Sequence, residues 1–416
     1  MKKKGSIKNF FAKLGPGLIT GASDDDPSGI ATYSQAGAQF GLGLLWTAFL
    51  TFPLMLAVQE MCARIGLASS QGLISNIKRH YSPFIIYTIL LLMVPTIVFN
   101  ISADIASMGA VIHLLVPAIP IFIASLVMCI FMLFYIIVLS YRQMVSFLKY
   151  LCLSLLLYLI IPFLCKQDLP AILKSSFTPG FIFTYEYVGM FIAILGTTIS
   201  PYLFFWQTTM AVEDAKHKKT KLTGKHFTKM VQDVAVGMFS SNLVMYFIIL
   251  TTGTVLYKNG IHQILTVEDA AKALEPLAGE FAFLLFSLGI LGTGFLAIPV
   301  LAGCLSYMVC STFDCSEGLD KKLKHAKLFY FLIGLSILLA LLLNLIGLNP
   351  IKALIISAIA NGLASPPLLL IILWMANDKK IMGKKTNGIL SNSLGVLTWI
   401  LMTGASILFF YFQLVK

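Results

Sequence analysis

The sequence has few charged residues. Only 12% of its 416 residues are Asp, Glu, Lys or Arg, whereas 58% are hydrophobic and the mean hydropathy is +0.88. Soluble globular domains carry roughly 25% charged residues. The composition therefore excludes a soluble globular domain and predicts an integral membrane protein.

The sequence also lacks the common motifs of redox, zinc and hydrolytic sites. Its seven cysteines are scattered, without a Cys-x-x-Cys pair or a histidine at ligand spacing. Ser/His/Asp groupings and phosphate-binding loops are missing at positions near a membrane face. We therefore expect no enzyme activity and no resident cofactor.

No cleavable leader is expected at the start of the chain. The opening stretch "MKKKGSIKNFFAKLGPGLI" has a basic end before an apolar run, but no small-residue cleavage site follows it. The run continues instead into an acidic stretch.

Long apolar runs fill most of the sequence. Runs of about 20 residues are long enough to cross about 30 Å of hydrocarbon. They predict eleven transmembrane helices in one domain spanning 1–416, at about 12–36, 42–63, 83–116, 119–140, 147–165, 183–212, 233–257, 280–312, 326–347, 350–376 and 390–414.

The net charge of +12 could indicate a nucleic-acid partner. Most of the 30 Lys and Arg residues, however, fall in alternate links, which all lie inside if the N-terminus is cytoplasmic. This distribution predicts a multi-pass protein of the cell membrane with an extracellular C-terminus. The partners expected are the lipid bilayer and a small substrate, with no nucleic acid and no obligate protein partner.

Two of the predicted helices contain breakers near their middle. In the first, Asp26-Pro27-Ser28-Gly29 lies about twelve residues past Gly15, or about 18 Å along a helix. In the sixth, the stretch 196–201 ("GTTISP") lies at a similar depth from the opposite side. Paired interruptions in corresponding helices indicate a transporter built from an inverted repeat. We predict repeats at about 12–165 and 183–376, with an extra helix at about 390–414.

Three consecutive aspartates, Asp24, Asp25 and Asp26, lie beside the first break, in the stretch "GASDDDPSGIATY". Each carboxylate at the bilayer centre costs at least about 2.5 kcal/mol. Helix capping before Pro27 explains Asp26 alone, so a cation is the expected partner of the others. The candidate metal-binding residues are Asp24, Asp25, Asp26, Gly29, Thr197, Thr198, Ser200 and Tyr202.

All of these candidates offer oxygen atoms. No Met, Cys or His occurs within either motif, so nothing there selects a soft transition metal. Oxygen ligands suit Mg²⁺, Ca²⁺ or Mn²⁺, and Mg²⁺ usually keeps several of its waters.

The chain resembles the Nramp divalent-metal transporters. "GPGLITGASDDDPSGIATYSQAGAQFG" is similar to their helix 1, with its Asp-Pro-Gly-Asn motif, and "GTTISPYLFFWQTTM" is similar to their helix 6, which usually reads Ala-Thr-Val-Met-Pro-His-Asn. The segments "CARIGLASSQGL", "ADIAS" and "NPIKALIISAIANGLASPPLLL" also fit, in order. The resemblance implies a leucine-transporter-like, all-α fold of eleven helices with helices 1 and 6 broken at the midplane.

Some of the family's metal-binding residues are replaced in this sequence, and these replacements bear on which metal ion is transported. By this resemblance Asp26 keeps the metal-binding aspartate, and Thr197 has the position whose backbone carbonyl binds metal. Gly29 stands at the asparagine ligand, Ser200 at the methionine and Tyr202 at the histidine. Without the methionine, the preference for Mn²⁺ and Fe²⁺ over Mg²⁺ is lost. This pattern resembles the Nramp-related magnesium transporters.

Proton coupling is the second departure. The resemblance places a proton pathway on helices 3 and 9, where Asp104 keeps one acid but Ser107 replaces the usual glutamate. We predict transport without proton coupling. Asp104 has two interpretations, a pathway residue or a carboxylate satisfied by Ser or Thr hydroxyls. Asn361 either lines the cavity or forms an interhelical hydrogen bond.

The sequence thus predicts an importer of largely hydrated Mg²⁺ that works by alternating access, and it leaves Mn²⁺ open as a second substrate. The alternatives are a proton-coupled Mn²⁺/Fe²⁺ symporter, an amino-acid or amine carrier, and a sensor or structural protein. Three aspartates in the first helix argue against the amino-acid carrier, which would need an acid-poor helix there to hold a carboxylate.

Overall fold

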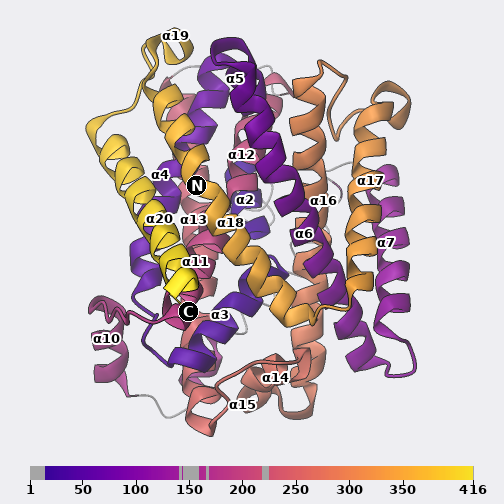
Figure 1. Ribbon diagram of the computed structural model, residues 1–416, viewed down its shortest axis with the longest axis vertical. Coiled ribbons are helices and arrows are strands. Elements are labelled where there is room, and N and C mark those ends of the chain that lie inside the picture. The colour runs from indigo at the N-terminus through magenta and orange to yellow at the C-terminus, as the bar shows by residue number, and fades with distance from the viewer. Residues whose placement is uncertain (1–14, 140–142, 144–158, 165–167, 218–223, 416) are drawn as a thin grey trace, which may run out of the picture.

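The described part of the chain is helical throughout. The structure, a computed structural model, describes residues 15–139, 143, 159–164, 168–217 and 224–415 (Figure 1). Within these residues, nine helical segments are long and apolar enough to cross a membrane, and all regular secondary structure is α or 3-10 helix. The fold is that of an all-α multi-pass membrane protein, as predicted.

The first predicted span is divided into two helices. α2 (Pro16–Asp24) and α3 (Pro27–Phe40) follow one another with only Asp25 and Asp26 between them. Pro27 begins α3 without leaving an unpaired amide, because the first residues of a helix have no intrahelical acceptor. Asp26 caps the same end by accepting a hydrogen bond from the Gly29 amide at 2.7 Å. The break is thus encoded locally.

The sixth predicted span is divided in the same way. α11 (Tyr185–Thr198) ends two residues before α12 (Pro201–His217) begins. The last bond of α11 runs from the Ile199 amide to the Leu195 carbonyl at 2.8 Å, and Pro201 opens the next helix. Both breaks therefore use a proline at the start of the second half-helix.

Eight other long helices overlap predicted spans, six of them closely. They are α4 (Thr47–Ser69), α6 (Pro83–Leu115), α7 (Ile121–Val138), α13 (Gly224–Val255), α16 (Ala282–Thr312), α17 (Lys327–Leu343), α18 (Pro350–Asn377) and α20 (Ile389–Val415). α4 ends six residues later than predicted, and α13 begins nine residues earlier. The predicted span 147–165 lies mostly outside the described residues. The total of eleven helices and the limits of the two repeats therefore stay predictions.

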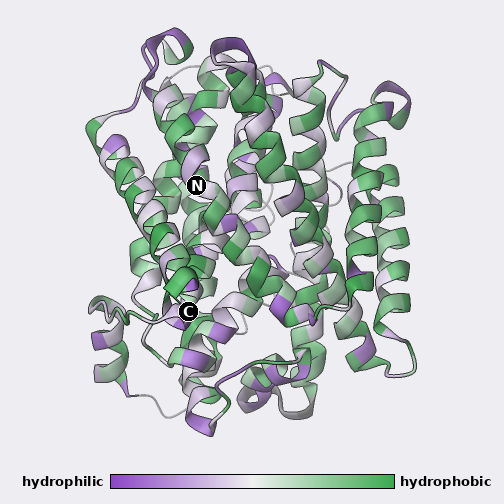
Figure 2. Cartoon of the chain, viewed as in Figure 1, coloured by the Kyte–Doolittle hydropathy of each residue, from purple (hydrophilic) through white to green (hydrophobic). Residues whose placement is uncertain are grey.

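Short helices cover the two ends of the bundle. They are α5 (Leu73–His80), α9 (Ile161–Leu164), α10 (Leu169–Phe177), α14 (Val267–Ala271), α15 (Glu275–Ala278) and α19 (Lys379–Met382), with 3-10 turns η2 (Tyr257–Asn259), η3 (Lys272–Leu274), η4 (Gly279–Phe281), η5 (Leu323–His325) and η6 (Asn344–Ile346). The basic helices α5 and α19 lie at the upper end in Figure 1, and α10, α14 and α15 at the lower end. Hydrophilic residues gather at both ends (Figure 2), while the belt between them is mainly apolar.

Close helix contacts hold the broken helices in place. α2 rests on α13 where Gly21 meets Gly237, and a Cβ at Gly21 would overlap the backbone of Gly237. α11 rests on α18 in the same way, where Gly196 meets the backbone of Ala358 and Gly362. Such small-residue contacts let membrane helices approach closely and pack tightly. They fix both breaks against unbroken neighbours.

Candidate metal-binding site

Asp26 is held by its own helix and by α6. One carboxylate oxygen caps α3 through the Gly29 amide at 2.7 Å, and the other accepts from the Asn100 side-chain amide at 3.0 Å. The Asn361 amide of α18 in turn donates to the Asn100 carbonyl oxygen at 3.5 Å. Asn361 therefore forms an interhelical hydrogen bond, one of the two roles predicted for it, and it belongs to the network of Asp26.

Asp24 and Asp25 are bonded on the opposite side, by α13. The Ser241 hydroxyl lies 3.0 Å from an oxygen of Asp24 and 3.1 Å from an oxygen of Asp25. The second oxygen of Asp24 lies 3.3 Å from the Ser200 hydroxyl, which comes from the break between α11 and α12. The two helix breaks thus meet through oxygen atoms, as the sequence predicted.

The three carboxylates are shielded from solvent. Asp24 is 1% exposed, Asp25 4% and Asp26 2%. Within the described chain, no Lys or Arg side chain forms an ion pair with any of them. Buried carboxylates that have only neutral hydrogen-bond donors attract a cation strongly, because their negative charge is not balanced.

The acids do not converge on one point. Among the described residues, no three His, Cys, Asp or Glu side chains are grouped so that they could hold a metal ion together. Asp26 is bonded toward α6, whereas Asp24 and Asp25 are bonded toward α13. A cation between the two breaks would therefore meet few carboxylates directly, which suits an ion that keeps its waters.

The predicted residues of the second break differ in their roles. The Ser200 hydroxyl lies 2.7 Å from the Thr197 carbonyl, so this carbonyl already has one donor. The Thr198 hydroxyl donates its proton to the Ile194 carbonyl within α11 at 2.8 Å. The Tyr202 hydroxyl donates to the Ser23 carbonyl at 3.2 Å and joins α12 to α2. Thr197, Ser200 and Tyr202 therefore lie at the junction of the breaks, and Thr198 serves its own helix.

Gly29 of α3 lies close to the last turn of α11. A Cβ at this position would lie 3.2 Å from the Thr197 hydroxyl oxygen and 3.3 Å from the Asp24 carbonyl oxygen. A larger residue would have to displace one of them. The next residue upstream, Ser28, donates from its hydroxyl to the Leu354 carbonyl of α18 at 2.8 Å, so α3 is fixed on that side too.

Asp104 on α6 is fully buried and unusual. Neither of its carboxylate oxygens has a hydrogen bond of normal geometry among the described residues. Asp26 and the Ser28 amide are near enough to act on its charge, and the Ser107 hydroxyl donates to the backbone carbonyl of Asp104, not to its side chain. The interpretation of Asp104 as a carboxylate satisfied by Ser or Thr hydroxyls is therefore wrong for this structure.

Three residues at the site were not predicted. Asn100 and Ser241 bond the aspartates, and the Cys304 thiol of α16 donates to the Tyr202 carbonyl at 3.2 Å. Asn100 could have been found, because it precedes Asp104 by one helical turn on the same face. Ser241 and Cys304 lie in other helices, and only the tertiary fold brings them to the breaks.

The fold and the site define a class of protein. Two half-helix pairs meet at buried oxygen donors inside an apolar bundle, an arrangement typical of membrane transporters with broken helices. Residues 17–412 match the model of the family described as natural resistance-associated macrophage protein-like, Nramp. The match covers most of the chain, and the protein belongs to this family.

Curated relatives agree with the family match over nearly the whole chain. The divalent metal cation transporter MntH of Bacillus subtilis is 24% identical over 408 residues, which cover 95% of this chain and 91% of the relative. The protein of the same name from Caldanaerobacter subterraneus is 23% identical over 400 residues, which cover 94% of this chain and 90% of the relative.

Solved structures agree with the predicted leucine-transporter-like fold. The manganese transporter of Eremococcus coleocola superposes with a TM-score of 0.76 at 17% identity, over 98% of this chain and 88% of that one. Mhp1, a nucleobase-cation-symport-1 family transporter, gives a TM-score of 0.54 at 13% identity, over 95% of this chain and 92% of that one.

Proposed function

We propose that the protein carries divalent cations across the membrane by alternating access, with Mg²⁺ as the main substrate and Mn²⁺ open as a second one. The observation that carries this proposal is the meeting of the two helix breaks through oxygen atoms, with Ser200 at 3.3 Å from Asp24. Buried, unbalanced carboxylates at such a junction need a mobile cation. The names of the curated relatives support a divalent metal as cargo.

The preference for Mg²⁺ rests on the donor atoms at the junction. Asp26, Thr197 and Ser200 offer only oxygen, which suits hard cations. The Cys304 thiol lies next to Tyr202, and its S–H is directed at the Tyr202 backbone carbonyl. The carboxylates form two separate groups, so the ion would contact few of them directly and would keep most of its waters. Asp26 would anchor this hydrated ion. Asp24 and Asp25 would contact it through water.

The driving force in this proposal is the membrane potential. Two positive charges gain about 4.6 kcal/mol per 100 mV. Two observations support transport without proton coupling: Ser107 stands beside Asp104, and α17 has no charged residue beyond Lys327 at its start. The basic helices α5 and α19 share one end of the bundle, which supports a cytoplasmic N-terminus and an extracellular C-terminus.

A proton-coupled Mn²⁺ symporter is the second candidate. The observation that favours it is Asp104, whose carboxylate is buried without a hydrogen-bond donor of normal geometry in the described chain. Such a group can take up a proton when a cation leaves.

One flux experiment separates the two candidates. Proteoliposomes would hold a Mg²⁺ dye and a pH dye, and a potassium diffusion potential would drive uptake. We expect wild-type uptake of Mg²⁺ to follow the potential without acidification. Asp26→Asn should abolish this uptake, and Glu268→Gln, at an exposed position of α14, should not. Acidification that tracks metal entry, with Mn²⁺ taken up in the presence of excess Mg²⁺, would instead establish the symporter.

A further inference from the structure

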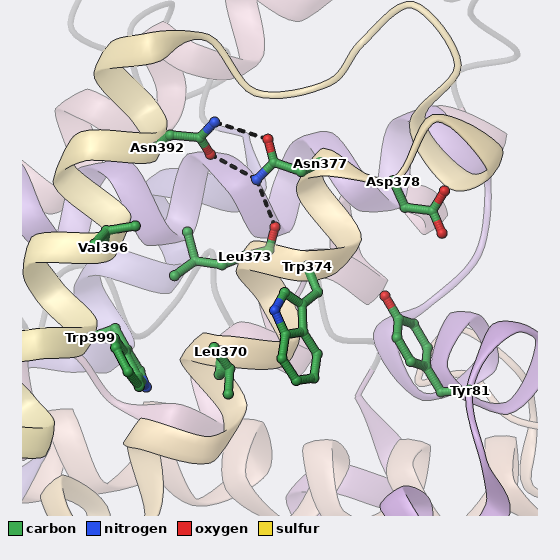
Figure 3. A pocket seen from close by; sticks show the side chains of 9 residues that line it. All are labelled: Tyr81, Leu370, Leu373, Trp374, Asn377, Asp378, Asn392, Val396 and Trp399. Atoms are coloured by element: carbon green, nitrogen blue, oxygen red, sulfur yellow. Dashed lines mark hydrogen bonds between the residues drawn. The ribbon is translucent and has the colours of Figure 1, made fainter.

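A cavity lies away from the helix breaks, at the end of the bundle where α19 lies. It has a volume of about 670 Å³ and lies beside α18 and α20 (Figure 3). Asn377 is the last residue of α18, and Asn392 belongs to the first turn of α20. The cavity therefore lies where two membrane spans end, at the level of the interface between hydrocarbon and water.

The polar rim of this cavity leaves one carboxylate oxygen available. Asn377 and Asn392 satisfy each other through two amide hydrogen bonds of 2.8 and 2.9 Å. Asp378 uses one oxygen to cap α19, accepting from the Lys380 amide at 2.8 Å. Its other oxygen has no hydrogen bond to any described residue. The rim thus presents a negative charge that the amides do not neutralise.

Two aromatic rings lie next to this carboxylate. In Figure 3 the hydroxyl end of Tyr81 points into the space between Asp378 and Trp374, and the Trp374 indole borders the other side of this space. Trp374 is 53% exposed although it belongs to a membrane helix. Burial and the Asp378 carboxylate raise the pKa of Tyr81, so the negative charge acts on this ring. A carboxylate together with the faces of Trp and Tyr attracts an ammonium group.

The rest of the cavity matches the other parts of a phospholipid. Leu370, Val396 and Trp399 form its apolar lining toward the middle of the membrane. Exposed Lys379 and Lys380 follow Asp378 directly in the chain and attract phosphate. The ammonium group is the outermost part of such a lipid, and its phosphate lies between that group and the acyl chains. The carboxylate at the water end of the cavity and the apolar lining below it therefore match the two ends of the lipid, and the lysines lie near enough in the chain to attract the phosphate.

We propose that this cavity is a binding site for a phospholipid with an ammonium headgroup, of the phosphatidylethanolamine type. The ammonium group bonds Asp378 and stacks on Trp374 and Tyr81, while the acyl chains run along the groove between α18 and α20. An anionic lipid such as phosphatidylglycerol has the same phosphate but no ammonium group for Asp378 and the two rings to bind. This inference does not depend on the nature of the transported ion.

Tryptophan fluorescence offers a direct test. Of the four tryptophans, Trp46 and Trp206 are buried inside the protein, whereas Trp374 and Trp399 line the cavity. The full chain would be placed in phosphatidylglycerol nanodiscs that contain a small, equal fraction of brominated phosphatidylethanolamine or brominated phosphatidylglycerol. We expect at least twofold stronger quenching by the brominated phosphatidylethanolamine.

Two variants complete this test. Asp378→Asn keeps an oxygen to cap α19 but removes the charge, and should bring the quenching ratio to one. Asp314→Asn removes an exposed carboxylate that pairs with Lys78 elsewhere on the protein, and should keep the wild-type ratio. Equal quenching by both lipids in the wild type would overturn the proposal. An unchanged ratio in Asp378→Asn, or an equal loss in Asp314→Asn, would also overturn it.

Discussion

The Ser241 hydroxyl lies between two neighbouring carboxylates, 3.0 Å from Asp24 and 3.1 Å from Asp25. A hydroxyl has a single proton, so it can donate to only one of them at a time. The pair is therefore incompletely compensated within the protein. A cation that approaches the helix breaks would stabilise whichever of the two carboxylates is not accepting the hydrogen bond.

Replacement of Ser241 should make the protein depend more on its cation. In metal-free detergent, Ser241→Ala should be less stable by about 1.5–3 kcal/mol, the usual contribution of a hydrogen bond to a charged group. Saturating Mg²⁺ should narrow this difference in stability, because the folded variant, whose carboxylates have lost a donor, should bind Mg²⁺ more tightly than the folded wild type does. Thermal unfolding with and without Mg²⁺ measures both effects.

Ser240→Ala is the matched control for this prediction. Ser240 is the adjacent residue, is exposed, and donates to Val236 within its own helix. It should unfold like the wild type. A Ser241→Ala protein whose loss of stability is the same at every Mg²⁺ concentration would show that Ser241 acts apart from the metal.

The buried carboxylate of Asp104 should lower stability and contribute to transport. A buried charge without a partner costs more than a buried neutral amide, so Asp104→Asn should unfold at a higher temperature than the wild type. We expect it also to take up Mg²⁺ more slowly, since the negative charge near Asp26 is lost. Unfolding and proteoliposome flux would be measured on the same preparation.

Ser107→Ala provides the comparison, because the Ser107 hydroxyl donates only to the backbone of its own helix. It should leave both quantities almost unchanged. If Asp104→Asn unfolds at a lower temperature than the wild type, the carboxylate has a stabilising partner, and its interpretation as an unpaired pathway residue is wrong.

Sulfur at the second break should change metal preference. Ser200→Met places a thioether beside Asp24, and thioethers favour Mn²⁺ over Mg²⁺. We expect competition assays of flux to shift toward Mn²⁺. Ser365→Met is the control, because it adds the same volume at another buried serine near the same break. The Ser365 hydroxyl bonds the Ile199 carbonyl at 3.3 Å. An equal shift in both variants would point to crowding at the break as the cause.

Asp233 should hold one end of α2 against α13. Its two oxygens accept from the Gly15 and Gly17 amides at 2.9 and 2.7 Å. Asp233→Asn has one acceptor oxygen and no charge at this helix N-terminus, so hydrogen exchange in 16–24 should become faster. Exchange in α20 should not change. The exposed neighbour variant Gln232→Ala serves as control, and equal exchange in Asp233→Asn and the wild type would exclude this role.

The local parts of the fold could be predicted from the sequence. The predicted positions of both breaks are confirmed, because Pro27 and Pro201 interrupt a helix through local effects that reach only a few residues. The spans were predicted well because hydropathy over about 20 residues is a local property too. The role of Asp26 as a helix cap followed from its position before Pro27.

The partners of the acids could not be predicted in this way. Ser241 is 217 residues from Asp24 in the chain, and a single serine in an apolar helix gives no sign of what it contacts. The hydrogen bond from Thr198 to its own helix could not be predicted either. A Ser or Thr hydroxyl in a helix can bond either the preceding turn of its own helix or a group outside it. The sequence therefore shows three adjacent acids without their partners, whereas in the fold Asp26 bonds toward α6 and the other two toward α13.

Calorimetric titration of Mg²⁺ into the purified protein tests the role of Asp26 most directly. Asp26→Asn preserves the cap of α3, because asparagine caps helices as well as aspartate does. It removes the charge and replaces the oxygen that Asn100 bonds by an amide NH2 group. We expect Mg²⁺ binding to weaken at least tenfold, which corresponds to about 1.4 kcal/mol, while Glu268→Gln binds like the wild type. Equal affinity of Asp26→Asn and the wild type would contradict the assignment of Asp26 as the anchor of the transported ion.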